Sequence, residues 1–241
     1  MKRISLMPWL LLFIRLFLFA GIQALFALFF FLTGSTQAWE TSANWWIINV
    51  ALANLICLTL LICSFRAEGR RYWDIFRIQR ATLKQDLWAM AGIFLLTAPI
   101  SFLPNILLGG WLFGDSSLTL EMIVRPLPIW AVYLGMLFFP VTQGLVEIAF
   151  YFSFIMPKLD QKGIRPWLAL GLPSLFLALQ HIAVPLLLDG RFILWRALMF
   201  LPFAFLVGIV MRWRPRLLPY LAILHIVMDF SLPVMFLASA Y

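Results

Sequence analysis

Four ionisable side chains lie inside long apolar stretches of the sequence, where such groups are rare. They are Glu147, His181, His225 and Asp229. Ionisable groups at membrane depth are costly, so their presence there favours a functional site. The helical rise of about 1.5 Å per residue places all four near the middle of a bilayer. His225 and Asp229 are four residues apart and therefore share one helix face.

Three kinds of chemistry suit these groups. In hydrolysis, a carboxylate takes a proton from water, a histidine orients that water, and a second polar pair stabilises the oxyanion. Alternatively, Glu147, His181 and His225 are suitable ligands for a divalent metal such as zinc, which would activate a bound water. A proton or ion relay through a transporter is the third. Spacing alone does not choose among them. Taken singly, His181 also suits an interhelical hydrogen bond, Asp229 a structural bond to His225, and Glu147 a protonated carboxyl in a tight helix contact.

Polar and helix-breaking neighbours accompany the four residues. Gln143, Glu147 and Tyr151 recur every four residues and are expected on one helix face. Pro185 follows His181 by four residues and removes a backbone donor, so it is expected to bend its helix and admit water. A hydrated pocket lined by three helices is the economical way to solvate these groups.

The elements that carry these residues must be membrane helices. The 241 residues are 64% hydrophobic and 12% charged, and this excludes an ordinary soluble enzyme. The apolar runs predict an all-α, polytopic membrane helical bundle of about seven transmembrane helices, with eight also compatible, in one integral membrane domain over residues 1–241. The runs are Pro8–Leu32, Trp45–Phe65, Leu87–Leu108, Pro128–Met156, Trp167–Leu188, Phe192–Met211 and Leu217–Ala240.

The loop charges predict the orientation and explain the net charge of +8. Fourteen of the 18 basic residues fall on one side of a seven-span topology, which favours a cytoplasmic amino terminus and fits a bacterial inner membrane. We therefore expect contact with a lipid bilayer and no nucleic-acid partner. Arg125, Arg191 and Arg196 are assigned to the other side, and Arg15 is expected to snorkel. Residues 66–86 are expected to lie on the cytoplasmic surface as an amphipathic helix.

At the four buried residues the sequence resembles the CAAX-protease and bacteriocin-processing (CPBP) family of intramembrane endopeptidases. That family carries the motifs EExxxR, FxxxH and HxxxN or HxxxD on late helices. Glu147 matches the first glutamate, His181 the histidine of the second motif, and His225 with Asp229 the third motif. The resemblance covers approximately residues 130–235, the part that would form the catalytic core.

The resemblance implies a peptidase acting on a peptide or a membrane protein. Glu147 and His181 would activate water, while His225 and Asp229 would stabilise the oxyanion. The family has been described both as metal-dependent and as glutamate-type, so a metal held by the glutamate and the two histidines stays open. A prenylated carboxyl-terminal tail and a bacteriocin leader are substrates implied by the resemblance only, and the oligomeric state does not follow from the sequence.

The first motif is incomplete. Ile148 stands where the second glutamate belongs, Phe152 replaces the arginine, and Leu177 occupies the position of the second-motif phenylalanine. When a buried glutamate and its arginine partner are both absent, no unpaired charge is left behind. Their joint absence is therefore less damaging to the site than the absence of one partner alone.

Two interpretations follow from that departure. In the first, the chain is an active peptidase in which Gln143, Tyr151 or Asn105 supports Glu147. In the second, it is a catalytically degenerate member that acts as a membrane binding, scaffolding or immunity-like protein. Loss of function in Glu147→Gln with the fold intact favours chemistry, whereas survival of function favours binding.

Overall fold

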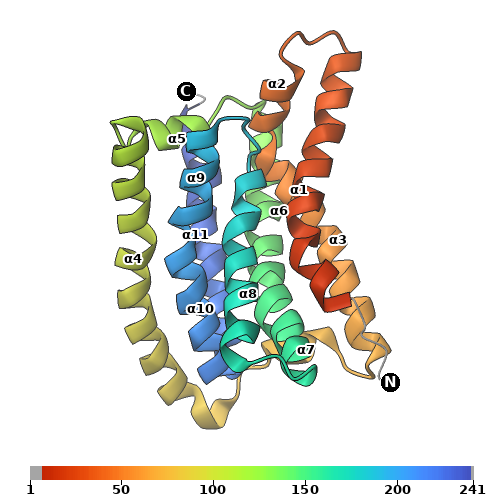
Figure 1. Ribbon diagram of the computed structural model, residues 1–241, viewed down its shortest axis with the longest axis vertical. Coiled ribbons are helices and arrows are strands. Elements are labelled where there is room, and N and C mark those ends of the chain that lie inside the picture. The colour runs from red at the N-terminus through yellow and green to blue at the C-terminus, as the bar shows by residue number, and fades with distance from the viewer. Residues whose placement is uncertain (1–6, 240–241) are drawn as a thin grey trace.

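The computed structural model describes residues 7–239 as helices packed side by side, with no strand among them (Figure 1). Seven helical segments within these residues are long and apolar enough to cross a membrane, which confirms the predicted all-α polytopic bundle. They are Met7–Leu32, Trp46–Ala67, Tyr72–Phe113, Ile129–Gln161, Pro166–Ala183, Gly190–Trp213 and Pro215–Ala238. The predicted end of the last span, Ala240, lies outside the described residues.

Several spans consist of more than one element. The α-helices are α1 (Met7–Leu32), α2 (Ala38–Asn44), α3 (Trp46–Ala67), α4 (Leu83–Phe113), α5 (Leu118–Ile123), α6 (Ile129–Ile148), α7 (Met156–Gln161), α8 (Pro166–Leu179), α9 (Gly190–Met199), α10 (Leu201–Trp213) and α11 (Leu218–Ser239). A π-helical turn, Ala149–Ile155, joins α6 to α7. Short 3₁₀ turns cover Tyr72–Phe76, Arg80–Thr82, Gln180–Ala183 and Pro215–Leu217.

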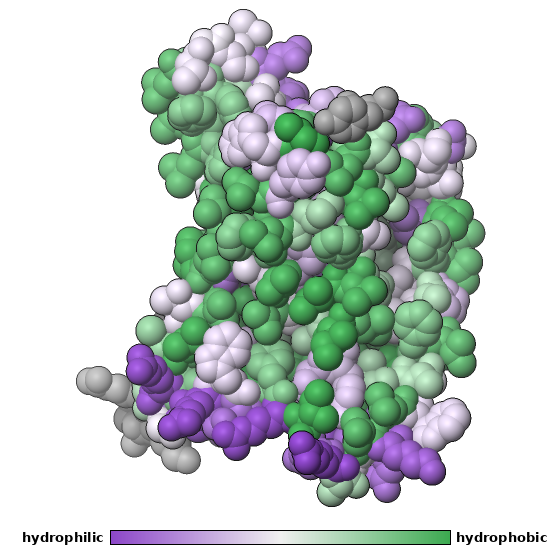
Figure 2. Space-filling model, turned by 180° about the vertical axis from the view of Figure 1, so that it is seen from behind, coloured by the Kyte–Doolittle hydropathy of each residue, from purple (hydrophilic) through white to green (hydrophobic). Residues whose placement is uncertain are grey.

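The two ends of the bundle differ in composition. One end, here called the basic end, holds α7 and the turns Tyr72–Phe76 and Arg80–Thr82; the opposite end holds α2 and α5 (Figure 1). Figure 2 shows apolar side chains over the middle of the molecule and hydrophilic side chains gathered mainly at the lower, basic end. An apolar belt between polar ends is the surface that a bilayer requires.

The segment before α4 differs from the amphipathic helix predicted for residues 66–86. It forms the two short 3₁₀ turns, with extended backbone at Arg71 and Arg77, and α4 begins at Leu83. Tyr72 explains the difference, because its ring is buried and its hydroxyl donates to Leu145 O at 2.5 Å. Only the Tyr72 side chain enters the bundle; most neighbouring residues are exposed, so the segment lies at the surface as predicted but not as one continuous helix.

Helices α6 and α11 approach each other closely at Gly144. A Cβ atom at this position would lie 2.7 Å from Ala222 O and would also collide with the Ile226 side chain. Small residues allow two membrane helices to bring their backbones together in this way. Glu147 lies one turn further along α6, so the contact places it opposite α11.

Polar residues occupy the level between two clusters of buried apolar side chains. In α1, Leu12 belongs to the cluster toward the basic end and Phe19 to the cluster toward the opposite end, with Arg15 between them. α6 runs in the opposite direction: Phe139 belongs to the cluster toward the end that holds α2 and α5, and Val146 belongs to the cluster toward the basic end. Arg15 and Gln143 therefore lie at the level where the two apolar clusters meet, near mid-span.

Candidate active site

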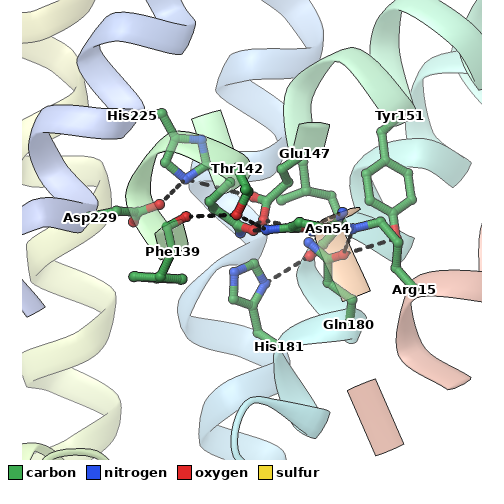
Figure 3. Close-up of polar contacts among 12 residues, drawn as sticks. Arg15, Asn54, Phe139, Thr142, Glu147, Tyr151, Gln180, His181, His225 and Asp229 are labelled. Atoms are coloured by element: carbon green, nitrogen blue, oxygen red, sulfur yellow. Dashed lines mark hydrogen bonds and ion pairs between the residues drawn. The ribbon is translucent and has the colours of Figure 1, made fainter. Parts of the chain in front are cut away.

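A cavity of about 260 Å³ brings together all four residues singled out in the sequence. Glu147 comes from α6, His181 from the 3₁₀ turn after α8, and His225 and Asp229 from α11 (Figure 3). Most other lining residues are apolar. The chain thus folds so that groups up to 82 positions apart in the sequence face one small volume.

The two oxygens of the Glu147 carboxylate have different surroundings. Oε2 accepts a hydrogen bond from Gln143 Nε2 and lies 3.6 Å from an Arg15 nitrogen. Oε1 lies 4.0 Å from His225 Nε2, too far for a direct hydrogen bond. Oε2 is therefore bound by Gln143 and lies near Arg15, while Oε1 faces His225 of α11.

Arg15 does not snorkel, contrary to the prediction; its side chain is completely buried. It donates to Gln180 Oε1 at 2.5 Å, to Asn54 Oδ1 at 2.7 Å and to Gln143 Oε1 at 3.2 Å. These acceptors and the Glu147 carboxylate offset the cost of removing a guanidinium from water. An arginine in mid-span was visible in the sequence, but its partners on three other elements were not.

His225 and Asp229 share one face of α11, as their spacing predicted. His225 Nε2 lies 3.2 Å from Asp229 Oδ2. The same nitrogen is the ring atom nearest Glu147, so one imidazole nitrogen faces two carboxylates from two helices. A proton on Nε2 would point into the space between them.

His181 lies at the point where α8 gives way to a tighter turn. Its Nδ1 lies 2.8 Å from Leu177 O, and because a carbonyl only accepts, Nδ1 carries the proton. In the neutral ring Nε2 is then an acceptor. The ring also stacks on Phe200, with centroids 3.8 Å apart and planes 21° apart, which fixes its orientation.

The expected bend of this span at Pro185 is instead an end of the helix. α8 stops at Leu179, and Val184, before the proline, has an extended conformation with φ −135° and ψ 86°. Proline disfavours a helical conformation in the residue before it, which accounts for the break. The span therefore ends near Ala183 and not at Leu188.

Arg196 is buried, although the charge pattern placed it at the far surface. Its Nε donates to His181 O at 3.1 Å, and one terminal nitrogen donates to Val184 O. The guanidinium lies over the Phe200 ring at 5.0 Å. Arg196 thus ties the non-helical turn that carries His181 to α9, a role that the sequence did not indicate.

Of the three residues predicted to support Glu147, only one contacts it directly. Gln143 bonds Glu147 directly. The Tyr151 hydroxyl donates to Gln180 Oε1 at 3.3 Å, so it reaches the Glu147 network only through Gln180. Asn105 lines the cavity but accepts from Trp195 Nε1 at 3.1 Å.

Tyr151 lies in the π-helical turn, Ala149–Ile155, and not in the continuous α-helix that its predicted face assumes. It is buried in the apolar cluster toward the basic end and does not line the cavity. Phe152, where the family motif has arginine, packs against α10: a Cβ on Gly208 would lie 2.8 Å from its ring. The guanidinium beside Glu147 comes from α1 instead.

Zinc ligation by Glu147, His181 and His225 has no matching geometry. Among residues 7–239, no group of three histidine, cysteine, aspartate or glutamate side chains is placed to hold a metal ion. Of the two carboxylates near His225 Nε2, Asp229 is the closer at 3.2 Å and Glu147 the farther at 4.0 Å.

Comparison with known proteins finds no family model that matches the chain, no similar curated protein and no similar solved structure.

Proposed function

We propose that this integral membrane protein is an intramembrane endopeptidase of the CPBP type that hydrolyses a peptide bond in a membrane-associated protein or peptide. The observation that carries the proposal is the convergence of Glu147, His181 and the His225–Asp229 pair on one cavity at mid-span. A carboxylate with a free oxygen, an imidazole acceptor and a carboxylate-bound imidazole are the groups that a water-dependent hydrolysis needs.

In this mechanism Glu147 is the base that activates the water. Gln143 and Arg15 hold Oε2, and this leaves Oε1 to accept a hydrogen bond from a water molecule. The 4.0 Å between Oε1 and His225 Nε2 is a separation that one water can bridge. The water gives a proton to Glu147 as its oxygen adds to the substrate carbonyl carbon, and His181 Nε2 accepts the second hydrogen bond that orients it.

The His225–Asp229 pair stabilises the charge that develops. In the structure the single Nε2–H group of His225 faces the Asp229 carboxylate, 3.2 Å away. When substrate binds, this group turns from Asp229 and the water to the carbonyl oxygen, to which it donates as that oxygen becomes an oxyanion. Glu147 then returns its proton to the amide nitrogen, the C–N bond breaks, and the carbonyl re-forms. Water is consumed, and a new carboxyl and a new amino terminus are released.

The charge distribution supports a cytoplasmic amino terminus in a bacterial inner membrane. The basic end carries twelve lysine and arginine residues against four acidic residues, whereas the opposite end carries two basic and four acidic residues. Basic loops remain preferentially in the cytoplasm. Lys2 and Arg3, which contribute to the same prediction, lie outside the described residues.

The test compares new protein termini by mass spectrometry in membranes with the unsubstituted protein or Glu147→Gln at equal abundance. General acid–base catalysis contributes about 10²- to 10⁴-fold, so the dependent termini should fall by that factor. Glu40→Gln makes the same chemical change at an exposed site and should leave them unchanged. If no terminus depends on Glu147 while the Glu147→Gln protein is folded, the peptidase is contradicted and the binding interpretation is favoured.

A further inference from the structure

The cavity extends from Glu147 in one direction only. Along α11, which runs away from the basic end, its lining residues are His225, Asp229, Leu232 and Met235. These span ten residues, or about 15 Å of helix. Along α6, which runs the other way, the lining residues Phe139 and Gln143 precede Glu147. Both helices therefore lead the cavity toward the end that holds α2 and α5.

The opposite direction is closed by packed side chains. Phe150, Tyr151 and Phe154, in the π-helical turn just beyond Glu147, are all buried within the apolar cluster of the basic end. No residue of the basic-end turns or of α7 lines the cavity. A substrate that reached Glu147 from the basic end would have to displace this core.

The mouth lies between α4, α5 and α11. Lining residues there are well exposed: Phe102 is 67% exposed, Leu120 45% and Met235 40%. Glu147 and His225, at the inner end, are 1% and 8% exposed. Because the exposed lining side chains on α4 and α11 are apolar, the mouth faces the side of the bundle as well as its end.

We propose that the site takes the extracytoplasmic juxtamembrane segment of a membrane-anchored protein, which enters sideways between α4 and α11. The substrate class rests on the proposed peptidase function. The mouth opens at the end with few basic residues, which the positive-inside rule assigns to the extracytoplasmic side. A segment anchored in the same bilayer reaches this mouth without leaving the interface.

The size and lining of the cavity restrict what enters. Its 260 Å³ is below the roughly 300–1,000 Å³ of sites that hold a whole small-molecule ligand. Phe139, Phe200 and Phe203 line it. This suits a few extended residues with an apolar side chain next to the cleaved bond, and it does not suit an intact helix.

The first experiment labels single cysteines with a membrane-impermeant maleimide in intact cells. Leu120→Cys reports the mouth, Asp115→Cys an exposed site at the same end outside the cavity, and Arg80→Cys the basic end. The unsubstituted chain, with buried Cys57 and exposed Cys63, gives the blank. We expect the first two variants to react in intact cells and Arg80→Cys to react only after permeabilisation. The reverse pattern overturns the proposal.

The second measurement locates the Glu147-dependent termini. We expect them in extracytoplasmic juxtamembrane segments, and we expect labelled Leu120→Cys to lose cleavage while equally labelled Asp115→Cys keeps it. Dependent termini in cytoplasmic tails overturn the inferred substrate but leave the peptidase standing. Absence of any dependent terminus refutes the peptidase and the substrate together, while the labelling result independently reports which side the mouth faces.

Discussion

Two buried arginines serve two different regions of the molecule. Arg15 contacts side chains from α3, α6 and the turn after α8, and one of them is the Glu147 carboxylate. Arg196 donates to two backbone carbonyls, and no carboxylate within residues 7–239 pairs with it. One arginine therefore balances a buried charge, and the other fixes the path of a non-helical turn. A buried cation can thus be retained for electrostatics or for chain geometry, and its partners show which.

The largest effect on stability is expected for Arg15→Met. It leaves Glu147 as an uncompensated buried charge, which costs about 3–5 kcal/mol. In a Glu147→Gln background the same change should cost much less, because no carboxylate is left unpaired. Thermal unfolding of the four proteins in detergent measures the coupling. Simple additivity would show that Arg15 does not balance Glu147.

Arg196→Met is expected to destabilise the protein less and without coupling to Glu147. Val184 O loses a hydrogen bond from a charged group, worth about 1.5–3 kcal/mol, whereas His181 O keeps the one that it accepts from Val184 N. Because the turn carries His181, cleavage should also fall. Arg191→Met, an exposed arginine on the same helix, is the control. Rescue of Arg196→Met by Glu147→Gln would erase the distinction between the two arginines.

Tyr151→Phe tests how far the Arg15 network extends. The change removes one hydrogen bond of 3.3 Å, worth about 0.5–1.5 kcal/mol, and Gln180 Oε1 keeps its bond to Arg15. We expect a small decrease in the unfolding temperature and unchanged cleavage. Loss of cleavage in a folded variant would place Tyr151 in the chemistry.

The smallest effect is expected at the basic end. Arg212 and Asp160 form an exposed ion pair at 2.8 Å, and such pairs contribute about 0–1 kcal/mol. Asp160→Asn should hardly change the unfolding temperature at moderate salt. A decrease in unfolding temperature as large as that of Arg15→Met would mean that the exposed Arg212–Asp160 pair stabilises the protein as much as the buried Arg15–Glu147 pair.

The fold and part of the site could be predicted because they depend on local sequence. Apolar runs of membrane length fix the seven spans, and the spacing of His225 and Asp229 fixes their common face. The partners of Arg15 could not be predicted, because Asn54 and Gln180 meet it only after α3 and the turn beyond α8 have packed.

Local patterns also failed where packing overrode them. The segment around Tyr72 looks amphipathic, yet its buried ring and its hydrogen bond to Leu145 divert the chain into short turns. The spacing of Gln143 and Tyr151 assumes an uninterrupted α-helix, and the π-helical turn after Ile148 breaks that assumption. Such turns need tertiary contacts to persist, so a single sequence gives little sign of them.

The close approach at Gly144 makes the distance between two groups of the candidate site depend on a residue outside that site. Glu147 and His225 are carried by α6 and α11, whose separation is set by the hydrogen atom that Gly144 has in place of a side chain. One added methyl group there would push the helices apart and widen the gap that a water must bridge. Gly144→Ala is therefore a way to change the width of the candidate site without substituting any of its polar residues.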